Sequence, residues 1–328
     1  MHIYRLICTL GFGLGLFGAP YQVASAAYPD RPVHIVVPFA AGGATDLAAR
    51  IIAPALQSRL GQPVVVDNKA GAGATIGTTA VATAPPDGYT LLLGSAANAI
   101  GNAISDYSQK KLPYVFERDF TGVALVAEVP GVLIVPTSFS AQNVVQLTAY
   151  AKSHPGELSY GSPGFGTSVH LAGELYESLA DVQLVHVPYK GASPAMTDLL
   201  GMRIQMMFPA LSVAQPYIDS GKVRALAITT SQRSSLAPNI PTMQEAGVAN
   251  YEVSGWLGIF APKGIAPDHL KILEKAINST LKDPQVQAAL AKISIEPTPG
   301  TAKVLNERLY ADTKRWSALI KKRKLDLQ

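Results

Sequence analysis

The sequence predicts an α/β protein with two lobes, and three observations favour this fold. Short apolar runs alternate with longer amphipathic runs along most of the 328 residues, a pattern typical of strands joined by crossover helices. Runs such as "HIVV" and "TLLL" lack polar alternation, so they should form parallel strands covered on both faces. The alternation falls into two blocks, and a third block completes the first lobe.

The first block follows residue 27 and contains short β-rich runs, "VHIVVPF", "PVVVDN" and "YTLLLGS". Amphipathic segments separate these runs. We therefore expect strands at 33–39, 63–68 and 89–95, with helices at 46–60 and 76–84.

The second block repeats the alternation without repeating the sequence. We expect strands at 122–136, 157–162, 182–189, 203–209 and 223–229, and helices at 142–152, 167–179, 193–200 and 213–220.

The third block contains a strand at 251–260 and helices at 268–281, 283–293 and 301–322. The long apolar strands at 122–136 and 251–260 flank the second block, which suggests a domain inserted into another. We therefore assign residues 27–127 and 255–328 to lobe 1 and residues 128–254 to lobe 2. Two crossing strands would permit the lobes to close over a cleft.

Residues 1–26 have the features of a cleavable signal peptide. Arg5 precedes an apolar run too short to span a bilayer, and Ala24-Ser25-Ala26 is a small-x-small cleavage pattern. Cleavage after Ala26 removes Cys8, the single cysteine, which excludes disulfides and thiol catalysis. We expect a monomeric protein in the periplasm.

The charge of the chain argues against a nucleic-acid partner. Without Arg5 the chain has 26 basic and 23 acidic residues, a net charge of +3. The densest basic cluster, "KKRK" at 321–324, suits the negative end of a helix dipole.

The stretch "VVPFAAGGATDLAAR" (36–50) joins a strand to a helix through a Gly-rich loop. Such a loop directs free N–H groups toward one point, although an ordinary capped turn has the same pattern. The Lys of a nucleotide P-loop is missing, so a less charged anion, such as a carboxylate, fits better. The candidate ligand-binding residues here are Phe39, Ala40, Ala41, Gly42, Gly43, Thr45 and Asp46.

The stretch "SYGSPGFGTSVHLAGELYE" (159–177) has the same arrangement in the second lobe. Two such loops, one per lobe, would hold a ligand from both sides of a cleft. The candidates are Ser162, Gly164, Gly166, Thr167 and His170, although His170 also fits a neutral histidine packed at the rim.

A third loop, "VPYKGASPAMTDLL" (187–200), adds Tyr189 and Asp198 as candidates. Asp198 falls in the last turn of a short helix, where a carboxylate needs a hydrogen-bond donor or solvent. Lys190 pairs with a carboxylate or is an ordinary surface residue.

Further candidates lie outside these loops. Ser95 and Asn98 follow the strand "TLLLG" and are candidate selectors of the ligand. Trp256 either lines the cleft or packs at the hinge.

Signatures of cofactors, metals and enzymes are missing from the sequence. "DNKAGAGATIGTTA" (67–80) has Ile76 where the dinucleotide fingerprint needs glycine, and the acid expected about 20 residues on falls at Asp87, in a turn. No G-x-S-x-G elbow or metal-ligand spacing of histidines occurs. We expect no cofactor, no metal and no enzymatic activity.

The chain resembles the Bug family, the periplasmic solute-binding receptors of tripartite tricarboxylate transporters. The matching stretches occur in family order and include "YPDRPVHIVVPFAAGGATD", "PPDGYTLLLGS", "YGSPGFGTSVHLAGEL", "VPYKGASPAMTDLLG" and "WLGIFAPKGIAP". The resemblance implies a type II-like periplasmic-binding-protein fold with two Rossmann-like lobes. It also implies a carboxylate held by the loops at 39–46 and 162–167.

We therefore expect a receptor that captures a small organic or aromatic carboxylate and delivers it to membrane permease subunits. One alternative is a secreted hydrolase that pairs Ser162 or Ser168 with His170. Another is a receptor that presents its solute to a signalling partner.

Overall fold

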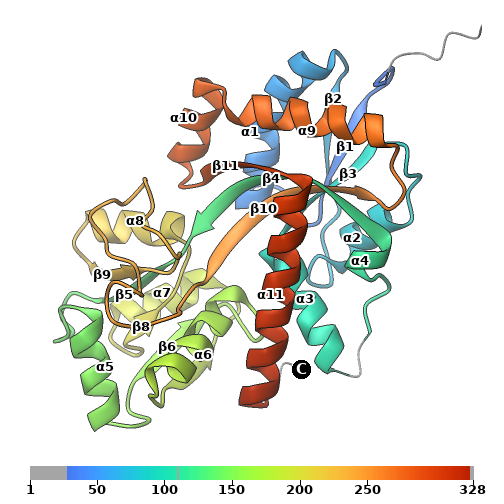
Figure 1. Ribbon diagram of the computed structural model, residues 1–328. Coiled ribbons are helices and arrows are strands. Elements are labelled where there is room, and N and C mark those ends of the chain that lie inside the picture. The colour runs from blue at the N-terminus through green and yellow to red at the C-terminus, as the bar shows by residue number, and fades with distance from the viewer. Residues whose placement is uncertain (1–27, 109–110, 326–328) are drawn as a thin grey trace, which may run out of the picture.

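The computed structural model describes residues 28–108 and 111–325, which form two sheets flanked by helices (Figure 1). The sheets lie in separate lobes, so the predicted two-lobed α/β fold is confirmed. The expected signal peptide at 1–26 lies outside the described residues. Within the described part, none of the helices has the length and hydropathy needed to cross a bilayer.

The sheet of lobe 1 has the strand order β11-β4-β10-β3-β1-β2. Its strands are β1 (Val33–Val37), β2 (Val64–Asn68), β3 (Thr90–Ser95), β4 (Phe120–Pro130), β10 (Ser254–Pro262) and β11 (Glu296–Thr301). The pairs β1–β2 and β1–β3 are parallel, as the buried apolar runs predict. The sheet is nevertheless mixed, because β10 runs antiparallel to both β3 and β4.

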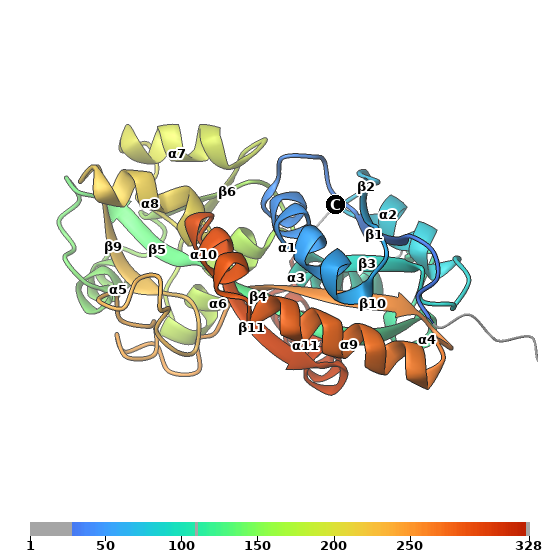
Figure 2. The same ribbon diagram turned by 90° about the horizontal axis from the view of Figure 1, so that it is seen from above.

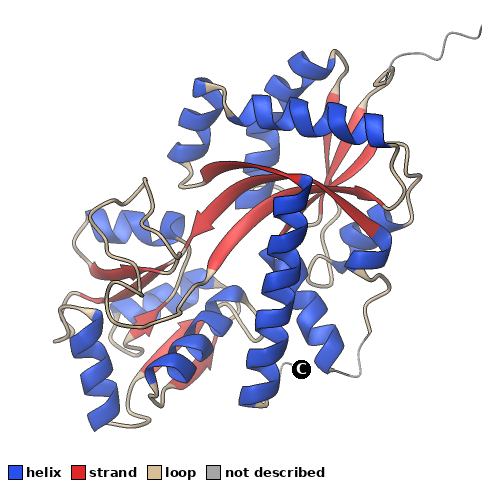
Figure 3. Ribbon diagram, viewed as in Figure 1, coloured by secondary structure: helices blue, strands red, loops and turns tan. Residues whose placement is uncertain are grey.

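Helices cover both faces of this sheet, as Figure 3 shows. They are α1 (Ala44–Leu60), α2 (Thr75–Ala82), α3 (Ala96–Tyr107), α4 (Phe116–Asp119), α9 (Pro267–Leu281), α10 (Pro284–Lys292) and α11 (Ala302–Arg323). Ile52 of α1 and Ile277 of α9 pack in one core with Ile35 of β1. The opposite face packs against α2, α3 and α11.

The sheet of lobe 2 has the strand order β7-β6-β8-β5-β9. Its strands are β5 (Val132–Pro136), β6 (Ser159–Ser162), β7 (Val185–Pro188), β8 (Met206–Met207) and β9 (Val223–Ile228), and its helices are α5 (Val144–Ser153), α6 (Ser168–Ala180), α7 (Ala192–Leu200) and α8 (Leu211–Asp219). Strand β6 is parallel to β7 and β8, whereas β5 is antiparallel to β8 and β9.

Strands β4 and β10 lie side by side and antiparallel where the chain passes between the two lobes (Figure 1), which are seen next to each other from above in Figure 2. The single strand expected at 122–136 is divided at Gly131 into β4 and β5, which belong to different sheets. A side chain at Gly131 would lie 2.6 Å from Oγ1 of Thr229, so the chain changes sheets where only glycine fits.

The last helix, α11, extends beyond lobe 1. It packs on α3 and β4, and its far end reaches α6 of lobe 2, where Arg323 pairs with Glu174 and Glu177. Nearer its start, Oδ2 of the buried Asp312 accepts a hydrogen bond from Nε1 of Trp256 at 2.8 Å. Trp256 is 1% exposed, so it packs at the hinge and does not line the cleft.

Three elements were not predicted from the sequence, namely α3, β11 and the four-residue helix α4. Helix α3 follows β3 without a break, and Ser95 and Asn98 form a capping box at its start. Strand β11 contains two prolines in "EPTPGT", and it occupies the edge of the sheet, where a missing N–H is tolerated.

Replacing Asp312 tests the packing of α11. We expect Asp312→Ala to lower the free energy of unfolding by about 2–4 kcal/mol, because it removes the acceptor of Trp256 and the partner of Arg308. Chemical denaturation measures this loss. Glu307→Ala, on the exposed side of α11, should change stability by less than about 0.5 kcal/mol. Equal losses in the two variants would contradict the assigned contact.

Candidate ligand-binding cleft

The carboxyl ends of parallel strands meet at the cleft side of each sheet. In lobe 1 the loops after β1 and β2 and the start of α3 lie along this edge, and in lobe 2 the loops after β6 and β7 do so. Ligands of open α/β sheets bind at such edges. A cavity of about 990 Å³ lies here and is lined by residues of both lobes.

Lobe 1 contributes two loops and one helix face to the cavity. The loops supply Phe39, Ala72, Gly73 and Thr75, and α3 supplies Ala97, Ile100, Gly101, Ile104, Ser105 and Tyr107. Lobe 2 contributes Phe165, Gly166, Thr167 and Ser168, and the wall is completed by Ser108, Leu112 and Leu325.

None of the described residues that line the cavity carries an ionised side chain. Its polar groups are hydroxyls and backbone amides. The starts of α2 and α6 face the cavity through Thr75 and Ser168. The first amides of a helix have no acceptor within that helix, but in α2 the amides of Thr75 and Ile76 donate to the Ala72 and Gly71 carbonyls of the preceding loop. Both helix ends also carry the positive end of a dipole, so the cavity can hold an anion without a cationic side chain.

The loop after β1 is held by Asp46. Its buried carboxylate accepts hydrogen bonds from the Gly42 amide, from Arg50 and from Asn68. The hydrogen bonds from Arg50 contribute most to lowering the pKa of Asp46 to about 2. Asp46 thus fixes the conformation of the loop, and Phe39 lines the cavity. The residues between them are exposed: Ala40, Ala41, Gly42 and Gly43. Thr45 is half-buried in the first turn of α1.

Ser95 and Asn98 are engaged inside the protein. Oδ1 of Asn98 accepts from the Ser95 amide at 2.9 Å, and its Nδ2 donates to Thr78 Oγ1 at 3.1 Å. Oγ of Ser95 accepts from the Ala97 amide. The pair fixes the start of α3, whose following turns line the cavity.

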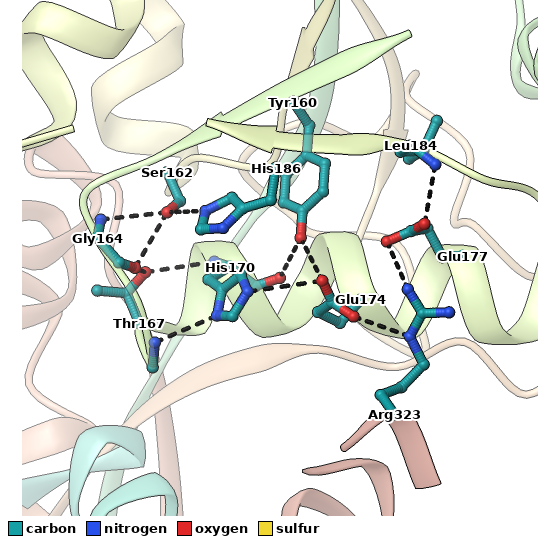
Figure 4. A network of polar contacts seen from close by, with 11 residues as sticks. Tyr160, Ser162, Gly164, Thr167, His170, Glu174, Glu177, Leu184, His186 and Arg323 are labelled. Atoms are coloured by element: carbon teal, nitrogen blue, oxygen red, sulfur yellow. Dashed lines mark hydrogen bonds and ion pairs between the residues drawn. The ribbon is translucent and has the colours of Figure 1, made fainter. Parts of the chain in front are cut away.

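The loop after β6 is bonded largely to itself (Figure 4). Ser162 is fully buried, and its Oγ accepts from the Gly164 amide and contacts His186 Nε2 at 2.7 Å. Oγ1 of Thr167 donates to the Gly164 carbonyl and accepts from the His170 amide. These contacts fix the backbone that leads into the start of α6.

His170 connects this loop to the last helix. Its Nδ1 accepts from the Gly166 amide at 3.2 Å, and its Nε2 lies 3.5 Å from Oε1 of Glu174. Burial raises the pKa of Glu174, but hydrogen bonds from His170, Arg323 and Tyr160 outweigh it and lower the pKa to about 2. His170 is 2% exposed, so it supports the loop from behind.

The hydrolase alternative needs a serine paired with His170. Within the described residues neither Ser162 nor Ser168 hydrogen-bonds His170, and Ser162 is instead paired with His186. The rings of His186 and His170 stack with their centroids 4.0 Å apart, and burial lowers the pKa of His186 to about 4. The buried Ser162 is therefore not presented to the cavity as a nucleophile.

Tyr189 and Asp198 contact one another and do not line the cavity. The Tyr189 hydroxyl donates to Asp198 at 2.8 Å, and Arg203 donates to the same carboxylate at 2.8 Å. The carboxylate of Asp198, near the end of α7, therefore accepts hydrogen bonds from two donors. Lys190 is exposed beside this pair.

The loop at 71–75 is a part of the site that sequence reasoning missed. Ala72, Gly73 and Ala74 all have positive φ, at 46°, 60° and 76°. Alanine rarely adopts this conformation, and such strain clusters at ligand sites. The strand–glycine–helix pattern of "DNKAGAGATIG" is the sequence signal for this loop, although the pattern does not fit the dinucleotide fingerprint.

Comparison with solved structures defines the class of the protein. The periplasmic binding protein BugD is 38% identical to this chain and superimposes with a TM-score of 0.72 over 92% of this chain and all of BugD. Rpa4515 from R. palustris, solved with adipate, is 34% identical, with a TM-score of 0.74 over 90% of this chain and 97% of its own. MatC from Rhodopseudomonas palustris, solved with malate, is 33% identical, with a TM-score of 0.72 over 89% of this chain and all of its own. The fold is that of periplasmic solute-binding receptors.

The family follows from the sequence comparisons. The model of the tripartite tricarboxylate transporter family receptor matches residues 48–325. Protein BugT of Bordetella pertussis is 35% identical over 321 residues, which cover 98% of each chain. The chain therefore belongs to the tripartite tricarboxylate transporter receptor family, and the resemblance to Bug proteins is confirmed.

Two substitutions at His170 test its support of the loop. Asn places an acceptor near the position of Nδ1, whereas Gln places its amide near Nε2. We expect hydrogen exchange of the Gly166 amide, followed by NMR, to accelerate at least about tenfold in His170→Gln and less in His170→Asn. Equal acceleration in both variants would contradict the Gly166–His170 hydrogen bond.

Proposed function

We propose that this chain is an extracytoplasmic receptor that captures a small organic or aromatic carboxylate between its lobes. In this proposal the receptor works in the periplasm and delivers the ligand to the membrane permease subunits of a tripartite transporter. The main support is a cavity between the lobes whose polar groups are backbone amides and hydroxyls, with the starts of α2 and α6 on opposite sides.

The proposed binding step involves no covalent chemistry. Amides fixed at the start of α6, together with the dipoles of α2 and α6, replace the water around the carboxylate, and closure of the lobes removes the remaining solvent. Because the ligand contacts both lobes, it stabilises the closed arrangement relative to the open one. The adipate and malate of the two R. palustris receptors are dicarboxylates, which favours this ligand class.

The candidate residues take two proposed roles. Phe39, Gly166 and Thr167 line the cavity and would contact the ligand, and Ala72, Gly73, Thr75 and Ser168 join them. Asp46, Asn98, Ser162 and His170 would act indirectly, because their polar atoms hold the loops in place. Direct contact by the exposed loop at 40–43, or by Tyr189 and Asp198, would require lobe closure around the ligand.

A thermal-shift screen tests the ligand class. A ligand present at about 100 times its Kd stabilises the folded state by about 2.7 kcal/mol, which should raise Tm by several degrees. We expect such shifts with mono-, di- or aromatic carboxylates and none with neutral sugars at equal concentration. Shifts with sugars alone would show that the ligand class is wrong.

Substitutions at two glycines test the lobe-2 loop. Gly166 has φ +69°, and an added Cβ would lie 2.9 Å from Cδ1 of Ile104, so Gly166→Ala should weaken carboxylate binding at least about tenfold. Gly221 has φ +67°, an added Cβ there meets no atom within 4 Å, and it does not line the cavity. Gly221→Ala is the matched control, and calorimetric titration should give less than about a threefold change in affinity. Wild-type affinity in Gly166→Ala would contradict the proposed contact.

A further inference from the structure

Phe165 is an aromatic side chain that the lobe-2 loop presents to the cavity. It lies between Gly164 and Gly166, whose φ angles of +133° and +69° are ones that other residues rarely adopt. The side chain is apolar, yet 52% of its surface is exposed. A ligand that covers this ring removes apolar surface from water, which is favourable.

The orientation of the Phe165 ring is set by two histidines. The rings of His170 and His186 are stacked with their centroids 4.0 Å apart. The Phe165 ring is nearly perpendicular to both, with centroid distances of 5.7 Å to His170 and 5.2 Å to His186. Because these two distances are similar, Phe165 lies beside the stack, and the edges of both imidazoles meet one face of its ring. The opposite face is the one that a ligand in the cavity can reach.

The two histidines are themselves held in place. Nδ1 of His170 accepts a hydrogen bond from the Gly166 amide, and Nε2 of His186 is hydrogen-bonded to Oγ of Ser162 at 2.7 Å. The ring of Tyr160 stacks on His186 from the other side, with centroids 4.9 Å apart. The exposed ring of Phe165 therefore rests on a fixed support. A ring that is already positioned loses little conformational freedom when a ligand packs on it.

The surroundings of Phe165 bring together an apolar surface and an anion-binding helix start. Ile104 of α3 lines the cavity, and its Cδ1 would lie 2.9 Å from a Cβ added at Gly166, the residue after Phe165. Thr167 and Ser168, at the start of α6, follow in the chain and also line the cavity. A carboxylate held at the start of α6 thus leaves the group attached to it near Phe165.

We propose that Phe165 selects ligands whose carboxylate is attached to an aromatic ring, which packs on the face of Phe165 opposite the two histidines. This inference rests on the proposed carboxylate function and names the ligand class more narrowly. It concerns the body of the ligand and holds for one carboxylate or for more. It separates this chain from the receptors solved with adipate and malate, whose ligands contain no aromatic ring.

Two acids with the same number of carbon atoms test the aromatic contact in the wild-type protein. Cyclohexanecarboxylate has at least as much apolar surface as benzoate, so burial of area alone favours the saturated acid or neither. A contact between two aromatic rings adds about two- to tenfold in affinity beyond the buried area. Calorimetric titration of the whole protein at neutral pH should therefore favour benzoate by at least about twofold.

Substitutions at Phe165 test whether this residue makes the contact. Phe165→Leu keeps an apolar side chain without a ring, so the preference for benzoate should disappear, whereas Phe165→Tyr keeps the ring and should retain the preference within about twofold. The ratio of the two Kd values is the informative quantity, because a loop that is merely disturbed weakens both acids alike. The matched control is Tyr310→Leu, which removes an exposed ring of α11 that does not line the cavity and should leave the ratio unchanged.

The outcomes separate this inference from the function on which it rests. If wild type binds cyclohexanecarboxylate as tightly as benzoate, or if adipate binds and neither cyclic acid does, the aromatic inference is wrong and the carboxylate function stands. If Phe165→Leu keeps the wild-type ratio, Phe165 does not select the ligand. If benzoate, cyclohexanecarboxylate and adipate all fail to bind, both the inference and the proposed carboxylate function are wrong.

Discussion

The antiparallel pairing of β4 with β10 is the constraint on which the rest of the structure depends. These strands are separated by more than 120 residues in the sequence, yet they pair from Ser254 with Pro130 to Pro262 with Phe120. Everything between them forms the second lobe, so the chain enters and leaves that lobe at one place. Both lobes can then direct the carboxyl ends of their parallel strands into a shared cleft, which places loops from residues 39–75 opposite those from 162–168.

In the proposed function, the cleft holds an anion although none of the described residues that line it is cationic. A buried Lys or Arg would hold an anion strongly, but it would cost desolvation when the cleft closed without ligand. Backbone amides at helix starts carry partial charges that are already oriented. The ionised groups near the site, Asp46 and Glu174, are used behind the loops, where they are paired with Arg50 and Arg323. These ionised side chains thus hold the loops in place, whereas the described side chains that line the cavity are neutral.

The sequence predicted the order of most strands and helices, the two lobes and the two crossing strands. Periodicity succeeds there because the apolar runs of β1, β3 and β4 have to be buried whatever the partners are. The sequence analysis did not predict α3, because Ser95 and Asn98 were interpreted as ligand-binding residues and not as the capping box that begins a helix. It also missed the division at Gly131, since a strand that changes sheets looks like a continuous apolar run.

The site was predictable only in part, for a related reason. Glycine-rich loops identify where backbone comes close to a ligand, which located the loops near Phe39 and Gly166. Which side chains face the cavity depends on contacts between distant segments. His170 follows the loop pattern but points to Glu174, and Ile104 meets Gly166 although 61 residues separate them in the numbering. Such contacts leave no local pattern in one sequence.

The course of α11 has a mechanical consequence. The helix rests on β4 in lobe 1, and its end is tied to lobe 2 by the paired guanidinium of Arg323. A rotation of one lobe against the other cannot be confined to the two crossing strands, because this third connection resists it. Such a rotation must either flex α11 along its 22 residues or separate Arg323 from its two carboxylates. The stiffness of the hinge is therefore set by a helix on the outside of the molecule as well as by the strands at its centre.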